Sequence, residues 1–158
     1  MNFVLLSPNY PPNYYHFAIA LRNIGATVLE IGDALYDDLN LALQDALTEY
    51  FRVDSLHYYD QVLRACAYFT FHYGKVNRLE SHNEAWLETD ARLRTDFNIP
   101  GLKIHAVECI KRKSLMKQVF INAGVEVAAA GIRRTLEEAR DFVAEVGYPI
   151  IAKPDVGV

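Results

Sequence analysis

The chain has 158 residues, of which 51% are hydrophobic and 23% charged, so it can form one buried domain and part of a second. Lys and Arg number 16 against 20 Asp and Glu, giving a net charge of −4. This acidic balance argues against nucleic acid or an anionic membrane surface as the main partner.

No segment indicates secretion or insertion into a membrane. The N-terminal apolar run at 3–6 is too short for a signal-peptide core and follows no basic residues. No stretch approaches the roughly 18 apolar residues of a membrane span. Cys66 and Cys109 match no metal-ligand spacing and are typical of buried reduced thiols. We therefore expect a cytoplasmic protein.

The first hundred residues alternate between short apolar runs and amphipathic helical patterns. The runs 3–6 and 27–31 predict buried strands, and the short crossover between them favours parallel pairing. The helix between them is expected to bury Phe17, Ala20, Leu21 and Ile24 and to end at Gly25. Further along, we predict a helix over 39–50, a strand over 50–53, a helix over 59–73 capped by Asp54 and Ser55, a strand over 76–81 and a helix over 84–97. This order predicts an α/β fold with a Rossmann-like, doubly wound parallel sheet.

A second part begins after Pro100-Gly101, the best boundary in the chain. A basic run at 111–113 precedes a helix that stops at Gly124. The spacing of Thr135 and Glu138 predicts a capping box that opens a further helix. Strands are expected over 125–128 and 150–152, followed by a loop over 153–157. The strand at 150–152 lacks an evident pairing partner.

Two lysines in this part are candidates for binding an anion. Lys153 follows an apolar strand pattern and precedes a loop with Gly157, an arrangement that suits a polyphosphate. Its alternative reading is a solubilising lysine on an edge strand. Lys113 lies at the start of a helix, where a positive charge opposes the helix dipole. Its alternative reading is a solvated surface residue.

The sequence resembles the ATP-grasp superfamily, which includes carbamoyl-phosphate-synthase-like and biotin-carboxylase-like enzymes. The resemblance rests on Lys113-Ser114-Leu115-Met116-Lys117, on Ala123-Gly124-Val125 and on the segment from Gly147-Tyr148-Pro149 to Lys153-Pro154. It implies that Lys113 and Lys153 contact the phosphates of ATP, and that Gly157 belongs to the glycine-bearing loop over them. It also implies a domain that precedes the ATP-grasp fold at 1–102 and the start of the ATP-grasp N-terminal subdomain at 103–158.

The resemblance implies a parent enzyme that uses ATP and Mg²⁺ to phosphorylate a small carboxylate, which an amine or similar nucleophile then attacks. Such an enzyme is a ligase, of the C–N type. The family's metal ligands lie in a later subdomain, so we expect this N-terminal piece to lack turnover by itself. We also expect an unmatched apolar edge near 148–153, and therefore self-association through this edge or disorder at the C-terminus. The alternative is a non-catalytic α/β binding or interaction module.

Asn83 and Glu84 are candidates for contacting the substrate. They lie where a strand ends and a helix begins, the usual place for ligand groups in an open parallel sheet. In the alternative reading they only start the helix, with Asn83 as its N-cap and Glu84 complementing the helix dipole.

Overall fold

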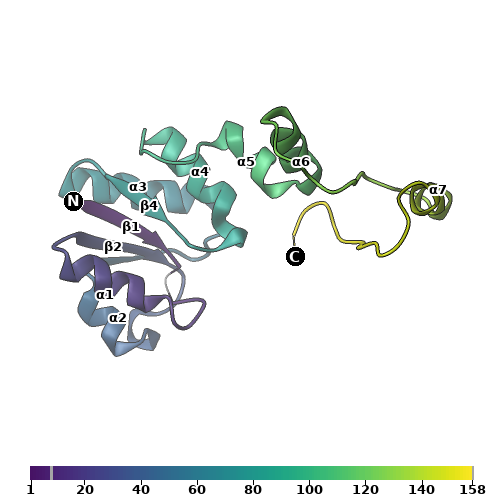
Figure 1. Ribbon diagram of the computed structural model, residues 1–158. Helices are drawn as coiled ribbons and strands as arrows, with labels where there is room; N and C mark the ends of the chain where they lie inside the picture. Colours follow the sequence, from purple (N-terminus) through teal and green to yellow (C-terminus); the bar gives the residue numbers. More distant parts are fainter. Residues whose placement is uncertain (8, 158) are drawn as a thin grey trace. The chain divides into compact units, whose positions relative to one another are not determined.

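The computed structural model describes residues 1–7 and 9–157, and these form two compact units, Met1–Ile104 and His105–Val158 (Figure 1). Among the helices of the described residues, none combines the length and the apolar character that crossing a membrane requires. The assignment of 1–102 and 103–158 to separate domains of a ligase stays a prediction.

The first unit contains a parallel sheet of four strands in the order β3-β2-β1-β4. Its strands are β1 (Asn2–Leu6), β2 (Thr27–Gly32), β3 (Glu49–Arg52) and β4 (Arg78–Glu80). The chain adds β2 and β3 on one side of β1 and then crosses to add β4 on the other side. The strand order therefore changes direction between β1 and β4, where open α/β sheets commonly bind ligands. The predicted α/β class is confirmed.

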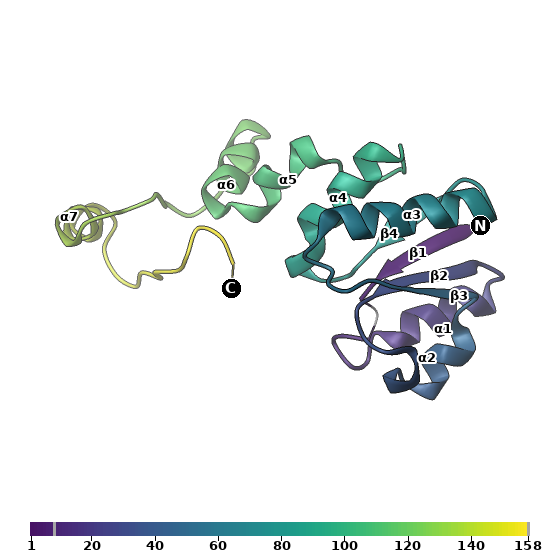
Figure 2. The same ribbon diagram turned by 180° about the vertical axis from the view of Figure 1, so that it is seen from behind.

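Helices cover both faces of this sheet (Figures 1 and 2). One face carries α1 (Tyr15–Asn23), the short helix η1 (Tyr36–Asp38) and α2 (Leu41–Ala46). The other carries α3 (Tyr59–Tyr73), η2 (Glu84–Trp86) and α4 (Leu87–Asp96). Side chains alternate along β1, so Leu5 packs in the core beneath α1 and α2, whereas Val4 and Leu6 pack in the core beneath α3.

Two details of this unit differ from the sequence-based expectation. In α1 the fully buried residue is Ala18, while Phe17 is 44% and Ile24 74% exposed. Ile24 follows the last helical residue, and Phe17 stacks on the ring of His82 instead of entering the core. The expected capping of α3 by Asp54 and Ser55 is also wrong, because α3 begins only at Tyr59 and has no side-chain cap.

The two cysteines lie in different environments. Cys66 is buried in the core beneath α3, and this burial raises the pKa of its thiol to about 12. Cys109 is only half-buried, so the prediction of a buried thiol is wrong at that position.

The second unit is helical, with α6 (Lys113–Asn122), α7 (Leu136–Val146) and α5 (Ile104–Lys111), which begins at the junction. Helix α5 had not been expected from the sequence. The predicted capping box of α7 is confirmed: the Thr135 hydroxyl accepts a hydrogen bond from the Glu138 amide at 3.1 Å, and the Glu138 carboxylate accepts one from the Thr135 amide at 3.3 Å.

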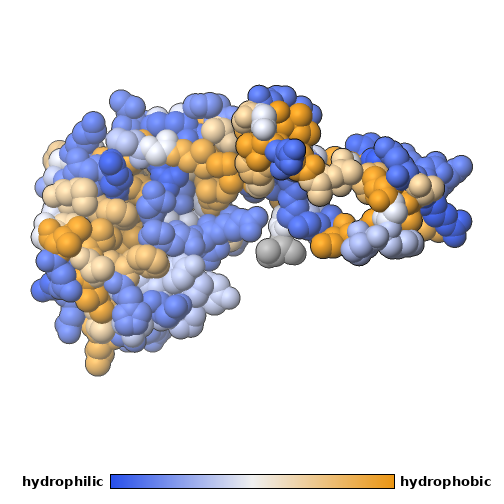
Figure 3. Space-filling view, viewed as in Figure 1, coloured by the Kyte–Doolittle hydropathy of each residue, from blue (hydrophilic) through white to orange (hydrophobic). Residues whose placement is uncertain are grey.

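The predicted strands at 125–128 and 150–152 are not formed. Neither segment has the ladder of hydrogen bonds that makes an extended segment part of a sheet, and no strand occurs in the described part of this unit. Ile151 is 83% and Tyr148 81% exposed. Apolar side chains also gather on the surface around α6 (Figure 3). Self-association through 148–153 stays a prediction.

Candidate phosphate site and substrate loop

Lys113 lies against the loop at 155–157, although more than 40 residues separate them in the sequence. The Lys113 backbone amide donates a hydrogen bond to the Asp155 carbonyl at 2.9 Å. Its ammonium group donates to the Gly157 carbonyl. An ammonium group has three N–H donors, so two of them are left for a further acceptor. The fold thus brings together two of the three residues for which ATP contact was predicted.

Asp155 closes the beginning of α6 from outside the helix. One of its carboxylate oxygens accepts a hydrogen bond from the Ser114 amide at 2.9 Å, and the other lies 3.5 Å from the Arg112 guanidinium. These contacts lower the pKa of Asp155, and the hydrogen bond from the Ser114 amide has the largest effect. The start of α6 is the positive end of its helix dipole, and the basic run at 111–113 adds more positive charge there. The Asp155 carboxylate offsets this positive charge.

We expect the substitution Asp155→Ala to loosen this loop. Without the carboxylate, the Ser114 amide loses its acceptor, and hydrogen exchange at the start of α6 should become about fivefold faster or more. Hydrogen exchange followed by mass spectrometry measures this directly. Asp141→Ala is the matched control, because Asp141 is an exposed carboxylate on α7 that makes no such bond. Equal exchange in all three proteins would show that Asp155 does not hold the loop.

Lys153 differs from Lys113 in having no partner among the residues that the structure describes. It is exposed, and within residues 1–7 and 9–157 it makes no hydrogen bond or ion pair. It lies two residues before Asp155, on the segment that leads into the loop. Its ammonium group is therefore available to an anion from solution. ATP contact by Lys113, Lys153 and Gly157 stays a prediction.

The turn after β4 places Asn83 as the N-cap of η2. The Asn83 side-chain oxygen accepts a hydrogen bond from the Ala85 amide at 2.9 Å, and Glu84 is the exposed first residue of the helix. The structure therefore contains the capping role that was the alternative for these two residues. Capping uses the Asn83 oxygen and leaves the amino group of its amide, so substrate contact stays a prediction.

A buried hydrogen-bond network of Ser81, Asp90 and Arg94 supports this turn. Asp90 accepts hydrogen bonds from the Ser81 amide at 3.1 Å and from the Ser81 hydroxyl at 2.7 Å. Burial raises the pKa of Asp90 to about 6, against the opposing effects of Ser81 and Arg94. Arg94, whose side chain is 3% exposed, donates to the Leu79 carbonyl at 2.7 and 3.0 Å and to the Glu80 carboxylate at 2.6 Å.

The turn after β4 also meets the start of α1. His82, the second residue after β4, and Ser7, the first residue after β1, have backbone φ angles of 56° and 51°. Non-glycine residues adopt this conformation rarely, and it is often found at functional sites. The His82 ring stacks on Phe17 with ring centroids 4.2 Å apart. This edge, where the strand order changes direction, is where Asn83 and Glu84 lie.

A magnesium site is not found among the residues that the structure describes. They contain no group of three or more His, Cys, Asp or Glu side chains that could hold a metal ion. Mg²⁺ is usually bound by one or two carboxylates together with substrate phosphates, so the groups near Lys113 do not form a metal cage by themselves.

The chain matches short segments of much longer curated proteins. It is 33% identical over 54 residues to the carbamoyl phosphate synthase large chain of Clavibacter michiganensis, and 38% identical over 55 residues to that of Synechocystis. Each match covers 34% of this chain and 5% of the relative. No protein-family profile matches the chain.

The fold occurs in solved structures that are about three times as long. The chain aligns over 99% of its length with an L-amino acid ligase from Bacillus licheniformis, at TM-score 0.65 and 14% identity, and covers 37% of that chain. It aligns equally fully with the biotin carboxylase domain of Hydrogenobacter thermophilus 2-oxoglutarate carboxylase, solved with MgADP, ADP and bicarbonate, at TM-score 0.69 and 20% identity. It covers 35% of that domain and 35% of phosphoribosylglycinamide synthetase from Anaerococcus prevotii, the latter at TM-score 0.63 and 15% identity.

The sequence matches and the structural matches agree on one group of proteins. The short matches with carbamoyl phosphate synthase arise from sequence alone, whereas the similarity to the carboxylase and the two ligases arises from the fold. The sequence matches support a relationship to the ATP-grasp superfamily, and the solved structures, at 14–20% identity, show that the fold is shared.

Proposed function

We propose that this chain is the front part of an ATP-dependent ligase that joins a carboxylate to an amine or a similar nucleophile, and that it supplies part of the grip on ATP. The observation that carries the proposal is the contact of Lys113 with the loop at 155–157, because it gathers cationic and glycine groups at one place. The carboxylase of similar fold was solved with MgADP. This supports ATP and Mg²⁺ as ligands of the proposed ligase.

In this proposal Lys113 and Lys153 neutralise negative charge on the phosphates of ATP. Lys113 is held in place by Gly157 and retains two N–H donors, while Lys153 has its full ammonium group available. Fixed positive groups favour phosphoryl transfer because charge moves among the phosphate oxygens as the γ-group leaves. ATP would supply the phosphoryl group that turns an unreactive carboxylate into an acyl phosphate. Gly157, at φ +88°, leaves room for close approach of the backbone.

The turn after β4 is the proposed contact for the substrate. The Asn83 amide amino group has no hydrogen-bond partner among the described residues, and Glu84 has an exposed carboxylate at the edge where the strand order changes direction. An amide donor suits a carboxylate, and a carboxylate suits an amine. The network of Ser81, Asp90 and Arg94 would hold these groups in position.

Turnover is not proposed for the 158 residues alone. They cover about a third of each ligase or carboxylase of similar fold, and their described part offers no metal cage. Release of ADP by this chain, in the presence of ATP, Mg²⁺ and a panel of amines and carboxylates, would contradict this part of the proposal.

Thermal stabilisation by ATP tests the proposed phosphate site. A ligand that binds only the folded protein at 100 times its Kd stabilises the protein by about 2.7 kcal/mol, so ATP should raise the melting temperature. Lys113→Ala and Lys153→Ala should each weaken ATP binding about tenfold or more, since each removes a charged partner of the phosphates. The matched control is Lys117→Ala, one turn further along α6, where the ammonium group is bound to the Ala128 carbonyl. If ATP stabilised none of the proteins, or if Lys117→Ala weakened binding as much as Lys113→Ala, the assignment of the phosphate site would be wrong.

A further inference from the structure

Three aromatic rings form a cluster at the edge of the first unit where the strand order changes direction. Phe17 of α1 and His82, which follows β4, stack with ring centroids 4.2 Å apart and ring planes at 20°. Tyr14, the residue before α1, meets both rings edge-on, with its centroid 5.5 Å from that of Phe17 and 6.1 Å from that of His82. These three residues, the aromatic cluster, connect the segment after β1 with the segment after β4.

The aromatic cluster is open to solvent and is not part of the core. Phe17 is 44% exposed, and His82 is exposed as well. The core does not require an aromatic ring here, because the residue that α1 buries fully is Ala18. A stacked ring uses one face for its neighbour and keeps the opposite face for another ring. The exposed stack of Phe17 and His82 therefore suits a flat ligand.

Hydrogen-bonding groups without partners lie beside the stack. Within residues 1–7 and 9–157, neither the ring nitrogens of His82 nor the Tyr14 hydroxyl makes a hydrogen bond. The amino group of Asn83, the next residue after His82, also has no partner there, because the capping of η2 uses only the amide oxygen. Such N–H and O–H groups are donors that a carboxylate can accept from.

The turn holds His82 in place on both sides. The Ser81 hydroxyl donates a hydrogen bond to buried Asp90 at 2.7 Å, and Asn83 is fixed as the N-cap of η2. These contacts maintain the uncommon φ of 56° at His82. The His82 ring is thus positioned on Phe17 before any ligand arrives, so binding a flat molecule orders few side chains.

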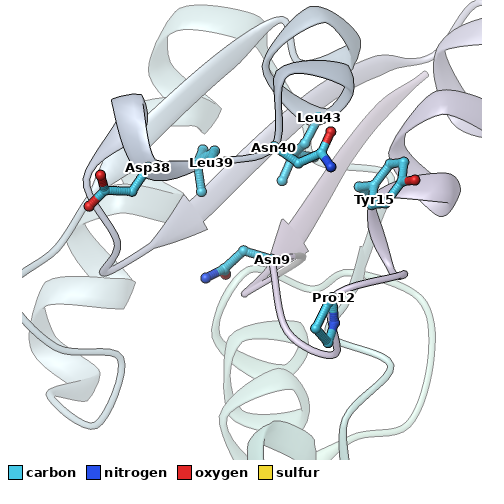
Figure 4. A pocket seen from close by; sticks show the side chains of 7 residues that line it. All are labelled: Asn9, Pro12, Tyr15, Asp38, Leu39, Asn40 and Leu43. Carbon is cyan, nitrogen blue, oxygen red and sulfur yellow. The ribbon is translucent and has the colours of Figure 1, made fainter.

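A nearby cavity offers a less suitable arrangement. It has a volume of about 210 Å³ and includes Tyr15, at the start of α1, in its wall (Figure 4). The Asp38 carboxylate is turned away from this cavity, and the amide nitrogens of Asn9 and Asn40 point in opposite directions (Figure 4). These polar groups do not converge on one ligand, whereas the groups of the aromatic cluster lie on one turn and one helix start.

We propose that the carboxylate substrate carries a flat aromatic or heteroaromatic ring, which stacks on Phe17 and His82. This inference rests on the proposed function, in which the turn after β4 contacts the substrate. The Asn83 amino group donates a hydrogen bond to the carboxylate of the same ligand. Phe17 and His82 thereby determine the specificity for the ring. All of these residues belong to the unit Met1–Ile104, so binding of the ring requires neither ATP nor Lys113.

Titration of the ¹⁵N-labelled chain with benzoate and with cyclohexanecarboxylate, followed by nuclear magnetic resonance, tests the ring specificity without ATP. Both probes carry one carboxylate on a six-membered ring, but only the ring of benzoate is flat and aromatic. We expect saturable shifts of the Phe17, His82 and Asn83 signals with benzoate, at a Kd of about 1 mM. Cyclohexanecarboxylate should bind about threefold to tenfold more weakly, because aromatic stacking contributes beyond the burial of apolar area. Equal affinities for the two probes, or no saturable shift with benzoate, would overturn the proposal.

Two substitutions remove the rings while keeping the local structure. Phe17→Leu keeps an apolar side chain, and His82→Asn suits the positive φ, which asparagine adopts more readily than most residues. Each should weaken benzoate binding about threefold to tenfold and reduce the preference for the flat probe.

The matched control is Phe71→Leu. Phe71 is an 85% exposed phenylalanine on α3 that also lies beside a histidine, but it meets the His72 ring edge-on, at 88°, and forms no stack with it. Its substitution should leave benzoate binding unchanged. Unchanged binding in Phe17→Leu, or an equal loss in Phe71→Leu, would contradict the inference. Thermal stabilisation by ATP should be the same in Phe17→Leu as in the wild type, so a failure of the ring specificity and a failure of the phosphate site are seen in different measurements.

Discussion

Replacing Glu30 with Gln should make the first unit more stable at neutral and alkaline pH. Glu30 is fully buried in β2, and neither of its carboxylate oxygens has a hydrogen-bond partner among the described residues. Burial raises the pKa of this carboxyl from its ordinary 4.5 to about 9. Its neighbour across the sheet is Tyr50, whose pKa is raised by burial and then by the charges of Glu30 and Asp33. The folded protein therefore keeps Glu30 protonated, and ionisation opposes folding.

The sign of the pH dependence follows from the direction of this pKa shift. Between about pH 4.5 and pH 9 the folded state holds a proton on Glu30 that the unfolded state has lost, so the free energy of unfolding falls as the pH rises. Each pH unit in this window costs about 1.4 kcal/mol, which amounts to roughly 3 kcal/mol at pH 7. Glu30→Gln removes the ionisation, so its stability should exceed that of the wild type increasingly from pH 5 to pH 8.

Urea unfolding followed by the fluorescence of Trp86 measures the stability of the first unit, which contains Glu30. Trp86 is the one tryptophan of the sequence, and it packs against the core beneath α3. Asp45→Asn is the control, because Asp45 is an exposed carboxylate on α2. If the wild type and Glu30→Gln showed the same change of stability between pH 5 and pH 8, Glu30 would not be buried as described.

Replacing Arg94 with Met should destabilise the first unit by about 3–5 kcal/mol, because it leaves buried partners unsatisfied. The Leu79 carbonyl would lose two hydrogen bonds, and the Glu80 carboxylate would lose its ion pair of 2.6 Å. Asp90, whose nitrogen-to-oxygen distance to Arg94 is 3.8 Å, would lose the nearby positive charge. Arg94→Lys should restore only part of the loss, since an ammonium group cannot reproduce the forked geometry of a guanidinium.

The matched control for Arg94 is Arg64→Met. Arg64 pairs with Asp60 at 2.8 Å, but the two side chains are 76% and 70% exposed, so the loss should be within about 1 kcal/mol. The same Trp86 fluorescence in urea compares the variants. A similar small loss for Arg94→Met would mean that the buried network contributes no more than a surface ion pair.

Local patterns in the sequence were sufficient for most of the first unit. The β-branched run at 27–31 and the apolar run at 3–6 became paired parallel strands, since both are buried on two faces. The capping box of α7 needs only Thr135 and Glu138, which are three residues apart, and it formed as predicted. The face that α1 buries was missed because it depends on contacts with a distant element, here the stacking of Phe17 on His82.

The candidate sites depend even more on distant contacts. Nothing in the sequence near Ser114 indicates that Asp155 will accept a hydrogen bond from its amide, since 41 residues separate them. The segments 125–128 and 150–152 have strand composition, but strand formation requires a pairing partner, which composition does not report.

We propose that Lys113 and Lys153 hold the phosphates of ATP, and ³¹P nuclear magnetic resonance of ATP reports on this contact at the phosphorus atoms themselves. Adding the wild-type chain should shift and broaden the β- and γ-phosphorus signals, and Lys117→Ala should do the same. The double substitution Lys113→Ala with Lys153→Ala should leave both signals where they are in free ATP, because it removes both cationic groups that are proposed to contact the phosphates. Unchanged signals with the wild type, or equal shifts with the doubly substituted chain, would contradict the account.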